Sequence, residues 1–322
     1  MADDLNENGP AERRREPVSL GVVVPVYNEA DAIPPFYQAL KPVLEPLGYE
    51  TQILFVDDGS TDDTRAAIRQ LQARDPSVRL VGLSRNFGKE AALSAGIDRI
   101  NTDVVVPIDV DLQDPPNLIP KMIERWREGY DVVYAVRTDR SMDAFGKRVT
   151  ASSFYRLFNK ISHERIPEDV GDFRLIDRRV VAALRQLPER NRFMKGLFAW
   201  VGFRAIGVPY ARQKRIIGST TLSWISLWRL AIDGITSFST LPLRIWTYIG
   251  VLSAILAFAY GTFIVARTLV LGADLPGYAS LMVVVLFFGG IQLISLGVIG
   301  EYLGRLFIEA KKRPIYLIDH ED

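Results

Sequence analysis

The sequence contains no cysteine and only two histidines, His163 and His320. The absence of cysteine excludes disulfide bonds and thiolate metal ligands, and it fits a reducing compartment. With so few histidines, a histidine-rich metal site is excluded as well. Any metal binding or acid–base chemistry must therefore depend on carboxylates, of which the chain has 38.

Two common phosphate-binding patterns are also missing. No Gly-x-Gly-x-x-Gly follows the first predicted strand, which disfavours a dinucleotide-binding domain. Residues 85–89, Arg-Asn-Phe-Gly-Lys, lack the spacing of a Walker loop. The first 17 residues are polar and charged, so we expect a disordered tail there rather than a signal peptide.

Charge is absent from two long stretches near the C-terminus. Residues 245–266 and 275–300 lack Asp, Glu, Lys and Arg, in a chain of which 24% is charged. At about 1.5 Å per residue, each stretch can cross a hydrocarbon core of roughly 30 Å. The alternative is a pair of buried core helices. We predict two transmembrane helices, because a single charge near the centre of a spanning helix costs about 2.5–3.5 kcal/mol and both stretches are free of charge.

The charges that flank these stretches predict their orientation. The loop between them carries little beyond Arg267 and Asp274. By the positive-inside rule, both termini then lie in the cytoplasm, and the protein is a multi-pass protein of the cytoplasmic (inner) membrane. The basic residues on the cytoplasmic side are Arg229, Arg244, Arg305, Lys311, Lys312 and Arg313.

The segment before the first stretch is basic and apolar. Between residues 195 and 244, Asp233 is the only acid, which suits an anionic ligand or anionic lipid headgroups, although a solvated basic face is the alternative. Bulky apolar residues recur there at helical spacing, which predicts an amphipathic helix at the membrane interface. A helix that faces a protein core is the other interpretation. The residues concerned are Trp224, Trp228, Ala231, Ile235 and Phe238.

The first half of the chain alternates short β-rich runs with longer helical patterns. This alternation predicts an α/β domain with a mainly parallel, twisted sheet covered by helices. Ligands of such domains bind beyond the carboxyl ends of the strands. We expect strands at 20–26, 52–56, 78–83, 104–108 and 131–136, and helices at 32–44, 62–74 and 89–100.

Acidic residues gather where these strands end. Asp109 and Asp111 follow the predicted strand 104–108, and hard oxygen ligands of this kind suit Mg²⁺ or Mn²⁺. Asp-x-Asp alone also occurs in loops by chance. The segment Asp57-Asp58-Gly59-Ser60 can be a turn with a helix cap, a ligand site for a nucleobase, or both.

Taken together, four motifs resemble glycosyltransferase family 2, and within it the polyisoprenyl-phosphate glycosyltransferases, which include bactoprenol glucosyltransferases and dolichyl-phosphate mannose synthases. The resemblance runs from about residue 20 to 316, and two C-terminal spans place the chain nearest the bactoprenol type. The motifs are specific for the family and poorly specific for the sugar. They are Pro-Val-Tyr-Asn-Glu at 25–29, Val-Asp-Asp-Gly-Ser at 56–60, Arg-Asn-Phe-Gly-Lys-Glu-Ala-Ala at 85–92, and Asp-Val-Asp-Leu-Gln-Asp at 109–114.

The resemblance implies a nucleotide-sugar-binding domain and a set of site residues. Asp172 matches the acidic catalytic position beside the acceptor, and Asp109 and Asp111 match catalytic positions on the donor diphosphate side. The metal site corresponds to Asp109, Asp111 and Gln113. The nucleotide-binding positions correspond to Pro25, Tyr27, Glu29, Asp57 and Lys89.

The acceptor-phosphate positions are Arg137, Arg148 and Ser152, with Arg212 and Arg215 on a loop that covers the site. One departure concerns this loop, because Thr221 stands where the family usually has a lysine, and Lys214 is a possible substitute. The resemblance thus divides the chain into a tail at 1–17, a cytoplasmic catalytic domain at 18–215, an interfacial segment at 216–243, two transmembrane helices at 244–304 and a cytoplasmic tail at 305–322.

The resemblance implies inverting transfer of a hexose, with glucose from UDP-glucose as the preferred donor, to polyisoprenyl (undecaprenyl) phosphate. Mg²⁺ or Mn²⁺ is the implied cofactor, the membrane is a partner, nucleic acid is not, and a homo-oligomer is expected. GDP-mannose, UDP-N-acetylhexosamine and UDP-amino-arabinose remain open as donors. A non-catalytic scaffold or lipid translocator is the alternative from another class. A processive polysaccharide synthase is disfavoured, since Met122 precedes Arg125-Trp126 where that class has glutamine.

Overall fold

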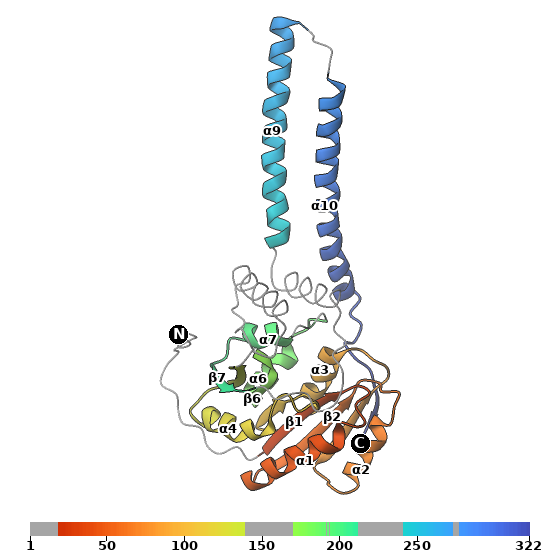
Figure 1. The fold of residues 1–322 in the computed structure, drawn as a ribbon, viewed down its shortest axis with the longest axis vertical. Coiled ribbons are helices and arrows are strands. Elements are labelled where there is room, and N and C mark those ends of the chain that lie inside the picture. Colours follow the sequence, from red (N-terminus) through yellow and green to blue (C-terminus); the bar gives the residue numbers. More distant parts are fainter. Residues whose placement is uncertain (1–18, 139–169, 191, 193, 212–240, 273–276) are drawn as a thin grey trace.

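The computed structural model describes most of the chain (Figure 1). The predicted N-terminal tail and nearly all of the predicted interfacial segment lie outside the described residues, as do Arg148, Ser152, Arg212 and Arg215. The described residues are 19–138, 170–190, 192, 194–211, 241–272 and 277–322.

The soluble part contains an eight-stranded sheet in the order β7-β5-β6-β4-β1-β2-β3-β8. Its centre is parallel, as predicted: β1 pairs with β2 and β4, and β2 pairs with β3, all in parallel. Strand β6 runs antiparallel to β4 and β5, and β8 runs antiparallel to β3. The strands are β1 (Ser19–Val26), β2 (Glu50–Asp57), β3 (Val78–Leu83), β4 (Val104–Pro107), β5 (Val132–Arg137), β6 (Val170–Asp177), β7 (Ala205–Tyr210) and β8 (Ile318–Glu321).

Helices cover both faces of this sheet. On β1, Val22 and Val24 face a cluster that includes α1, α2 and α4, whereas Val23 between them faces α3, α6 and α7. All three valines are fully buried, because successive side chains of a central strand point to opposite, covered faces. The helices are α1 (Ile33–Leu44), α2 (Thr64–Gln72), α3 (Lys89–Arg99), α4 (Ile119–Arg127), α6 (Arg178–Gln186) and α7 (Met194–Trp200), with short 3₁₀ turns η1 (Glu45–Leu47) and η2 (Pro116–Leu118).

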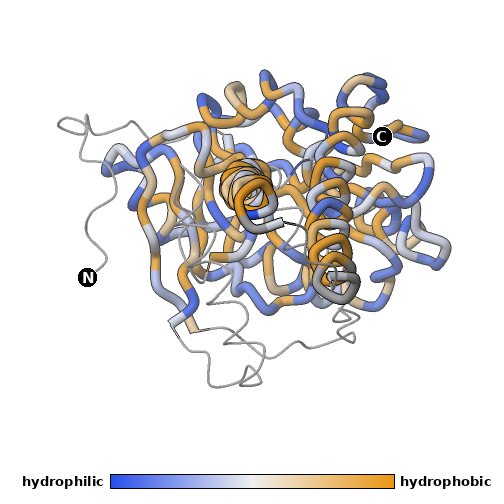
Figure 2. Tube along the Cα trace, turned by 90° about the horizontal axis from the view of Figure 1, so that it is seen from above, coloured by the Kyte–Doolittle hydropathy of each residue, from blue (hydrophilic) through white to orange (hydrophobic). Residues whose placement is uncertain are grey.

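Two long helices extend from the soluble part, α9 (Leu241–Leu271) and α10 (Tyr278–Ala310) (Figure 1). Seen almost end-on, both are mainly hydrophobic along their length (Figure 2). Their segments of 28 residues each have mean hydropathies of 2.2 and 2.3, and no part of the best windows is buried. Helices in a soluble core would bury these side chains, so the exposed surface indicates association with a membrane.

Helix α10 continues further than the predicted boundary at residue 304. It ends only at Ala310, beyond the charged residues Glu301 and Arg305. These two side chains are one helical turn apart and form an ion pair at 2.9 Å, which favours continuation of the helix. The charged residues therefore mark the end of the apolar stretch, whereas helix α10 itself continues to Ala310.

The residues after α10 return to the soluble sheet. Strand β8 pairs with β3 and forms the edge of the sheet beyond it, and the Leu317 carbonyl accepts a hydrogen bond from the Ser84 backbone N–H at 2.9 Å. The Tyr316 hydroxyl donates to Asp98 at 2.8 Å. The sequence predicted only a cytoplasmic tail at 305–322; the structure shows that this segment contains an edge strand.

We predict that deletion of residues 315–322 lowers the melting temperature of the detergent-solubilised protein by roughly 5–10 °C. The deletion removes backbone hydrogen bonds worth about 1 kcal/mol each and exposes the edge of β3. Scanning fluorimetry with light scattering measures both melting and aggregation. The control is Leu317→Ser, because the Leu317 side chain is 54% exposed. Equal melting temperatures for the deletion variant and the intact protein would contradict the role given to β8.

Candidate active site

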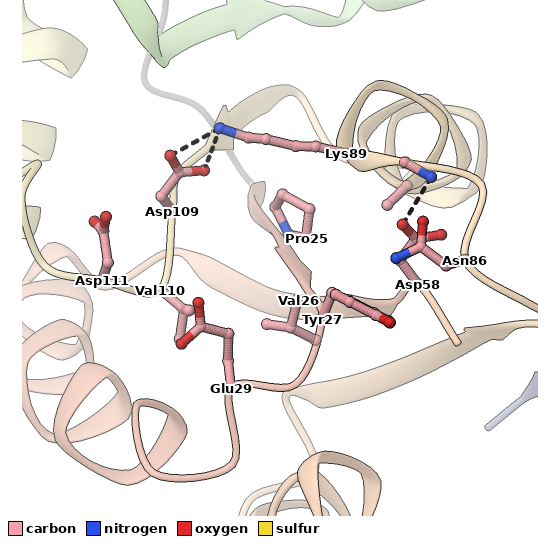
Figure 3. A pocket seen from close by; sticks show the side chains of 12 residues that line it. Pro25, Val26, Tyr27, Glu29, Asp58, Asn86, Lys89, Asp109, Val110 and Asp111 are labelled. Carbon is pink, nitrogen blue, oxygen red and sulfur yellow. Dashed lines mark hydrogen bonds and ion pairs between the residues drawn. The ribbon is translucent and has the colours of Figure 1, made fainter. Parts of the chain in front are cut away.

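A pocket of about 320 Å³ opens at the carboxyl edge of the parallel strands (Figure 3). Strands β1, β2 and β4 are neighbours and run in the same direction, so the loops that follow them meet at this edge. The end of β1, the loops after β1, β2, β3 and β4, and the start of α3 supply its lining. Among the residues that line it are Pro25, Tyr27, Glu29, Asp58, Lys89, Asp109 and Asp111.

The loop after β1 is tied to the loop after β2. The Asn28 backbone, at a φ of 54°, donates to the Ser60 hydroxyl at 2.9 Å, and the Asn28 side-chain oxygen accepts from the Thr61 N–H at 2.9 Å. The Glu29 N–H donates to the Thr64 hydroxyl at 2.9 Å. These bonds fix the backbone on which Tyr27 and Glu29 present their side chains to the pocket.

The two adjacent aspartates at the end of β2, Asp57 and Asp58, play different structural roles. Asp57 is fully buried, forms an ion pair with Arg65 and accepts a hydrogen bond from the Ser60 N–H at 3.0 Å. Asp58 lines the pocket instead. The sequence analysis selected Asp57 for nucleotide binding; the structure places Asp57 behind the turn and Asp58 at the pocket wall.

Asp58 holds the segment that leads into α3. Its carboxylate accepts hydrogen bonds from the Phe87 N–H at 2.7 Å and the Gly88 N–H at 2.8 Å. Burial raises the pKa of the Asp58 carboxyl, and the two backbone hydrogen bonds oppose this shift. Gly59 beside it has a φ of 72°, and a Cβ there would lie 2.4 Å from the Arg85 carbonyl carbon, so the close approach requires glycine.

Lys89 joins two carboxylates that the sequence separates widely. Its ammonium lies 2.7 Å from one oxygen of Asp109, 2.8 Å from the other, and 2.7 Å from Asp172 Oδ2. Figure 3 shows the Lys89 side chain reaching across the pocket to Asp109. Burial alone would lower the pKa of Lys89, but the charges of Asp172 and Asp109 raise it above its usual value. Three of the predicted residues therefore meet at one point.

Asp172 lies on β6 and has an unusual environment. Burial alone would raise its pKa, but the ammonium groups of Lys89 and Lys195 lower the pKa of Asp172 well below its usual range. Its Oδ1 atom is buried and has no hydrogen-bond partner among the described residues. A buried carboxylate oxygen is rarely left in this state, so the atom is a candidate contact for a ligand.

Glu90 follows Lys89 and lies close to Asp172. Its Oε2 atom accepts a hydrogen bond from the Met194 N–H at 3.2 Å. Burial, together with the negative charge of Asp172, raises the pKa of Glu90 to about 7. The sequence analysis did not select this residue, since no local pattern marks a glutamate whose environment comes from β6 and α7.

Of the predicted acceptor-phosphate residues, the structure describes Arg137. Its guanidinium donates to the Tyr210 hydroxyl at 3.3 Å, and Tyr210 in turn hydrogen-bonds Asp114. A Cβ added to Gly171 would lie 3.2 Å from the Arg137 guanidinium, which places this group beside the residue preceding Asp172. Tyr210 and Asp114 were not selected from the sequence, because Tyr210 reaches Arg137 only through the pairing of β5 with β7, in which these two residues lie opposite each other.

Asp109 and Asp111 fit a divalent metal ion that is shared with a substrate. Both carboxylates line the same pocket, and the Gln113 N–H donates to Asp111 Oδ1 at 3.1 Å. Within the described part of the chain, no group of three or more acidic or histidine side chains forms a complete cage. Mg²⁺ and Mn²⁺ often use one or two carboxylates and take the other ligands from water and substrate phosphates. The donor set is therefore suitable for a divalent ion.

Comparison with known proteins agrees with this site. Residues 21–185 match the model of the family described as glycosyl transferase family 2, and residues 241–306 match the model described as the GtrB C-terminal hairpin. The chain belongs to glycosyl transferase family 2 and is a glycosyltransferase. The match over the α/β domain identifies the glycosyltransferase family. The match over the hairpin identifies, within that family, the members that carry this C-terminal element.

Individual relatives cover nearly the whole chain. A prophage bactoprenol glucosyl transferase homolog of Escherichia coli (strain K12) is 52% identical over 94% of this chain and 98% of its own length. The bactoprenol glucosyl transferase of Shigella phage SfV is 51% identical over 94% and 99%. An uncharacterized glycosyltransferase, sll0501 of Synechocystis, is 51% identical over 94% and 95%.

A solved structure shares the fold at much lower identity. The mannosyltransferase PcManGT from Pyrobaculum calidifontis, in complex with GDP-Man and Mn²⁺, is 18% identical, with a TM-score of 0.51 over 96% of this chain and 90% of that one. At this identity the comparison supports the fold alone.

We predict that Asp58→Ala destabilises the segment that leads into α3. Two backbone N–H groups lose their acceptor, at a cost of about 2 kcal/mol, so the melting temperature falls by roughly 4–8 °C. Hydrogen exchange at the Phe87 and Gly88 amides becomes faster. Asp31→Ala, at an exposed position, is the control. Unchanged exchange at these two amides in the Asp58 variant would refute the assigned contact.

We predict a pH-dependent stability that depends on Glu90. Its folded-state pKa of about 7 exceeds the ordinary 4.5, so the folded protein binds more protons between these values and stability falls as pH rises through this window. Glu90→Gln removes the ionisation. The variant should melt roughly 3–6 °C above the unmodified protein at pH 8, and by less at pH 5.

Melting curves across pH 5 to 8 measure this difference. The matched control is Glu124→Gln, at an exposed position on α4. A Glu90→Gln curve that runs parallel to that of the unmodified protein at every pH would show that Glu90 has no raised pKa.

Proposed function

We propose that this chain transfers glucose from UDP-glucose to a polyisoprenyl phosphate, with inversion at the anomeric carbon, at the surface of the cytoplasmic membrane. The observation that carries the proposal is the convergence of Lys89, Asp109, Asp111 and Asp172 at one pocket edge, in a chain that also bears an apolar hairpin. Relatives with about half of their residues identical, over nearly the full chain, are named bactoprenol glucosyl transferases, which supports both glucose and the lipid acceptor.

The chemistry requires positive charge on both sides of the reacting carbon. Donor diphosphate and acceptor phosphate each carry about two negative charges. Two dianions about 5 Å apart, at an effective dielectric constant near 20, repel each other by roughly 13 kcal/mol. Such a barrier exceeds what binding can ordinarily offset, so cations must neutralise both partners.

For the donor side, we propose that Tyr27 and Glu29 contact the nucleoside from the fixed loop after β1. Pro25 shapes the pocket floor, and Asp58 lies within reach of the same ligand, while Asp57 supports the turn through Arg65. Asp109 and Asp111, with Gln113, are the residues that would hold Mg²⁺ or Mn²⁺. When bound, such an ion neutralises the diphosphate leaving group.

For the acceptor side, a phosphate oxygen forms the new bond to the anomeric carbon as the bond from that carbon to the nucleotide breaks. The second pKa of a phosphate is about 6, so the nucleophile is already an oxyanion near neutral pH and needs no strong base. We therefore assign Asp172 to positioning groups beside the acceptor rather than to removing a proton, and its buried Oδ1 can accept a hydrogen bond from a hydroxyl group of a ligand. Arg137 lies nearby, and Arg148, Ser152, Arg212 and Arg215 are proposed to complete the phosphate contacts.

The hairpin brings the domain to its lipid substrate. Basic residues on both sides of the hairpin favour an orientation in which the catalytic domain and both termini are cytoplasmic. We also propose that copies of the chain associate through the exposed apolar surface of α9 and α10. Cross-linking of cysteines introduced into α9 and α10, in membranes, tests the association of copies. Labelling of cysteines introduced near the C-terminus tests the orientation, and labelling from the periplasmic side would contradict it.

The test of function is mass spectrometry of lipid products after purified protein receives undecaprenyl phosphate and a panel of nucleotide sugars. We expect a hexosyl-phosphoryl lipid with UDP-glucose, abolished by chelation. Asp111→Asn should reduce turnover about 100-fold or more, because the leaving group loses part of its neutralisation. Asp31→Asn is the matched control at an exposed position. Full turnover under chelation, or in a variant without both Asp109 and Asp111 carboxylates, would overturn the proposed mechanism.

A further inference from the structure

The Lys89 ammonium group contacts three of the four carboxylate oxygens of Asp109 and Asp172. Lys89 Nζ contacts both Asp109 oxygens, at 2.7 and 2.8 Å, and Asp172 Oδ2 at 2.7 Å. The fourth oxygen, Asp172 Oδ1, is buried. A proposed metal ligand is thus already bound to a cation that belongs to the protein itself.

The two ends of this bridge differ in exposure. The Asp172 side chain is 17% exposed, and that of Asp109 is 34% exposed and lines the pocket. A cation that enters from solvent therefore meets Asp109 first. The Lys89 side chain is 46% exposed and has a flexible four-carbon stem, so its ammonium can move without movement of the backbone.

The position of Lys89 in the chain adds to the argument. It is the first residue of α3, at the end of the helix where a positive charge is unfavourable. The carboxylates offset this cost. The lining of the pocket contains four carboxylates, from Glu29, Asp58, Asp109 and Asp111, and Lys89 is the only ammonium or guanidinium group among the described lining residues.

We propose that Lys89 is a resident counter-cation of the donor site: it occupies Asp109 while the site is without donor, and it is displaced toward Asp172 when a divalent ion and a nucleoside diphosphate bind together. The inference deepens the proposed function and rests on the metal site assigned to Asp109 and Asp111. Its consequence is that the donor-free protein binds a divalent ion weakly, because the ion must compete with an ammonium group for Asp109.

The test measures Mn²⁺ binding, by electron paramagnetic resonance, to the full-length protein in detergent without nucleotide. Lys89→Met should bind Mn²⁺ roughly tenfold more tightly than the unmodified protein, which corresponds to about 1.4 kcal/mol. Lys89→Arg, which keeps the charge, should bind as weakly as the unmodified protein. Adding Asp109→Asn to Lys89→Met should abolish the gain, which assigns the ion to this site.

The matched control is Lys41→Met, since Lys41 forms a similar 2.6 Å ion pair with Asp75 outside the pocket lining. It should leave Mn²⁺ affinity unchanged. Circular dichroism checks folding of each variant, and Lys89→Gln, which retains a donor for Asp172, replaces Lys89→Met if the latter is unfolded. The inference is overturned if removing the charge does not tighten Mn²⁺ binding, or if Lys89→Arg binds as tightly as Lys89→Met.

Failure of this inference is distinguishable from failure of the proposed function. Mn²⁺ binding requires neither lipid nor sugar, so a tighter Lys89→Met variant supports the counter-cation even if no glucosyl lipid forms. Conversely, glucosyl transfer by the unmodified protein with no gain in Mn²⁺ affinity in Lys89→Met would leave the function standing and remove the role given to Lys89.

Discussion

Repulsion between carboxylates is the constraint on which the site depends. Parallel strands bring the loops after β1, β2 and β4 to one edge, and each loop carries acidic residues. Strand β6 adds Asp172 from the other side of β4. Such a cluster needs positive charge close by, and Lys89 supplies it from the start of α3. The clustered carboxylates thus need a nearby cation before any substrate binds. A divalent metal ion that is bound to a diphosphate can also meet this need.

The second constraint is how the soluble domain is attached to its hairpin. Helices α9 and α10 lie in the chain between β7 and β8, two strands of one sheet. Strand β8 is therefore synthesised only after the hairpin, so the sheet can be completed only once α9 and α10 have been synthesised. Arg190 also contacts α10, through a hydrogen bond from its backbone N–H to Glu309 at 2.8 Å. This contact and strand β8 attach the soluble domain to the C-terminal end of α10, which limits how far the pocket can move from that end of the hairpin.

Patterns within single elements were sufficient to predict the centre of the fold. The buried runs of β1 to β4, the charge-free helices and the acidic strand ends follow from local sequence, and the predicted strand ranges agree closely with the structure. The difference between Asp57 and Asp58 did not follow, since it depends on Arg65 and on the approach of Gly88. Strand β8 was also missed, because its sequence is polar and its place depends on antiparallel pairing with β3, which is distant in the chain.

The pairing of Lys89 with Asp172 spans 83 residues and explains why these two positions belong to one unit. The neighbouring ammonium groups hold the pKa of Asp172 well below its usual range, so its carboxylate is an anion near neutral pH. An anion beside an incoming phosphate would repel it. In the donor-free structure, one Lys89 charge is shared between Asp109 and Asp172. If a metal ion displaces Lys89 from Asp109 and Lys89 stays with Asp172, its whole charge offsets Asp172 and the acceptor phosphate meets less repulsion. Donor binding would then prepare the acceptor side, which gives a physical reason for the donor to bind first.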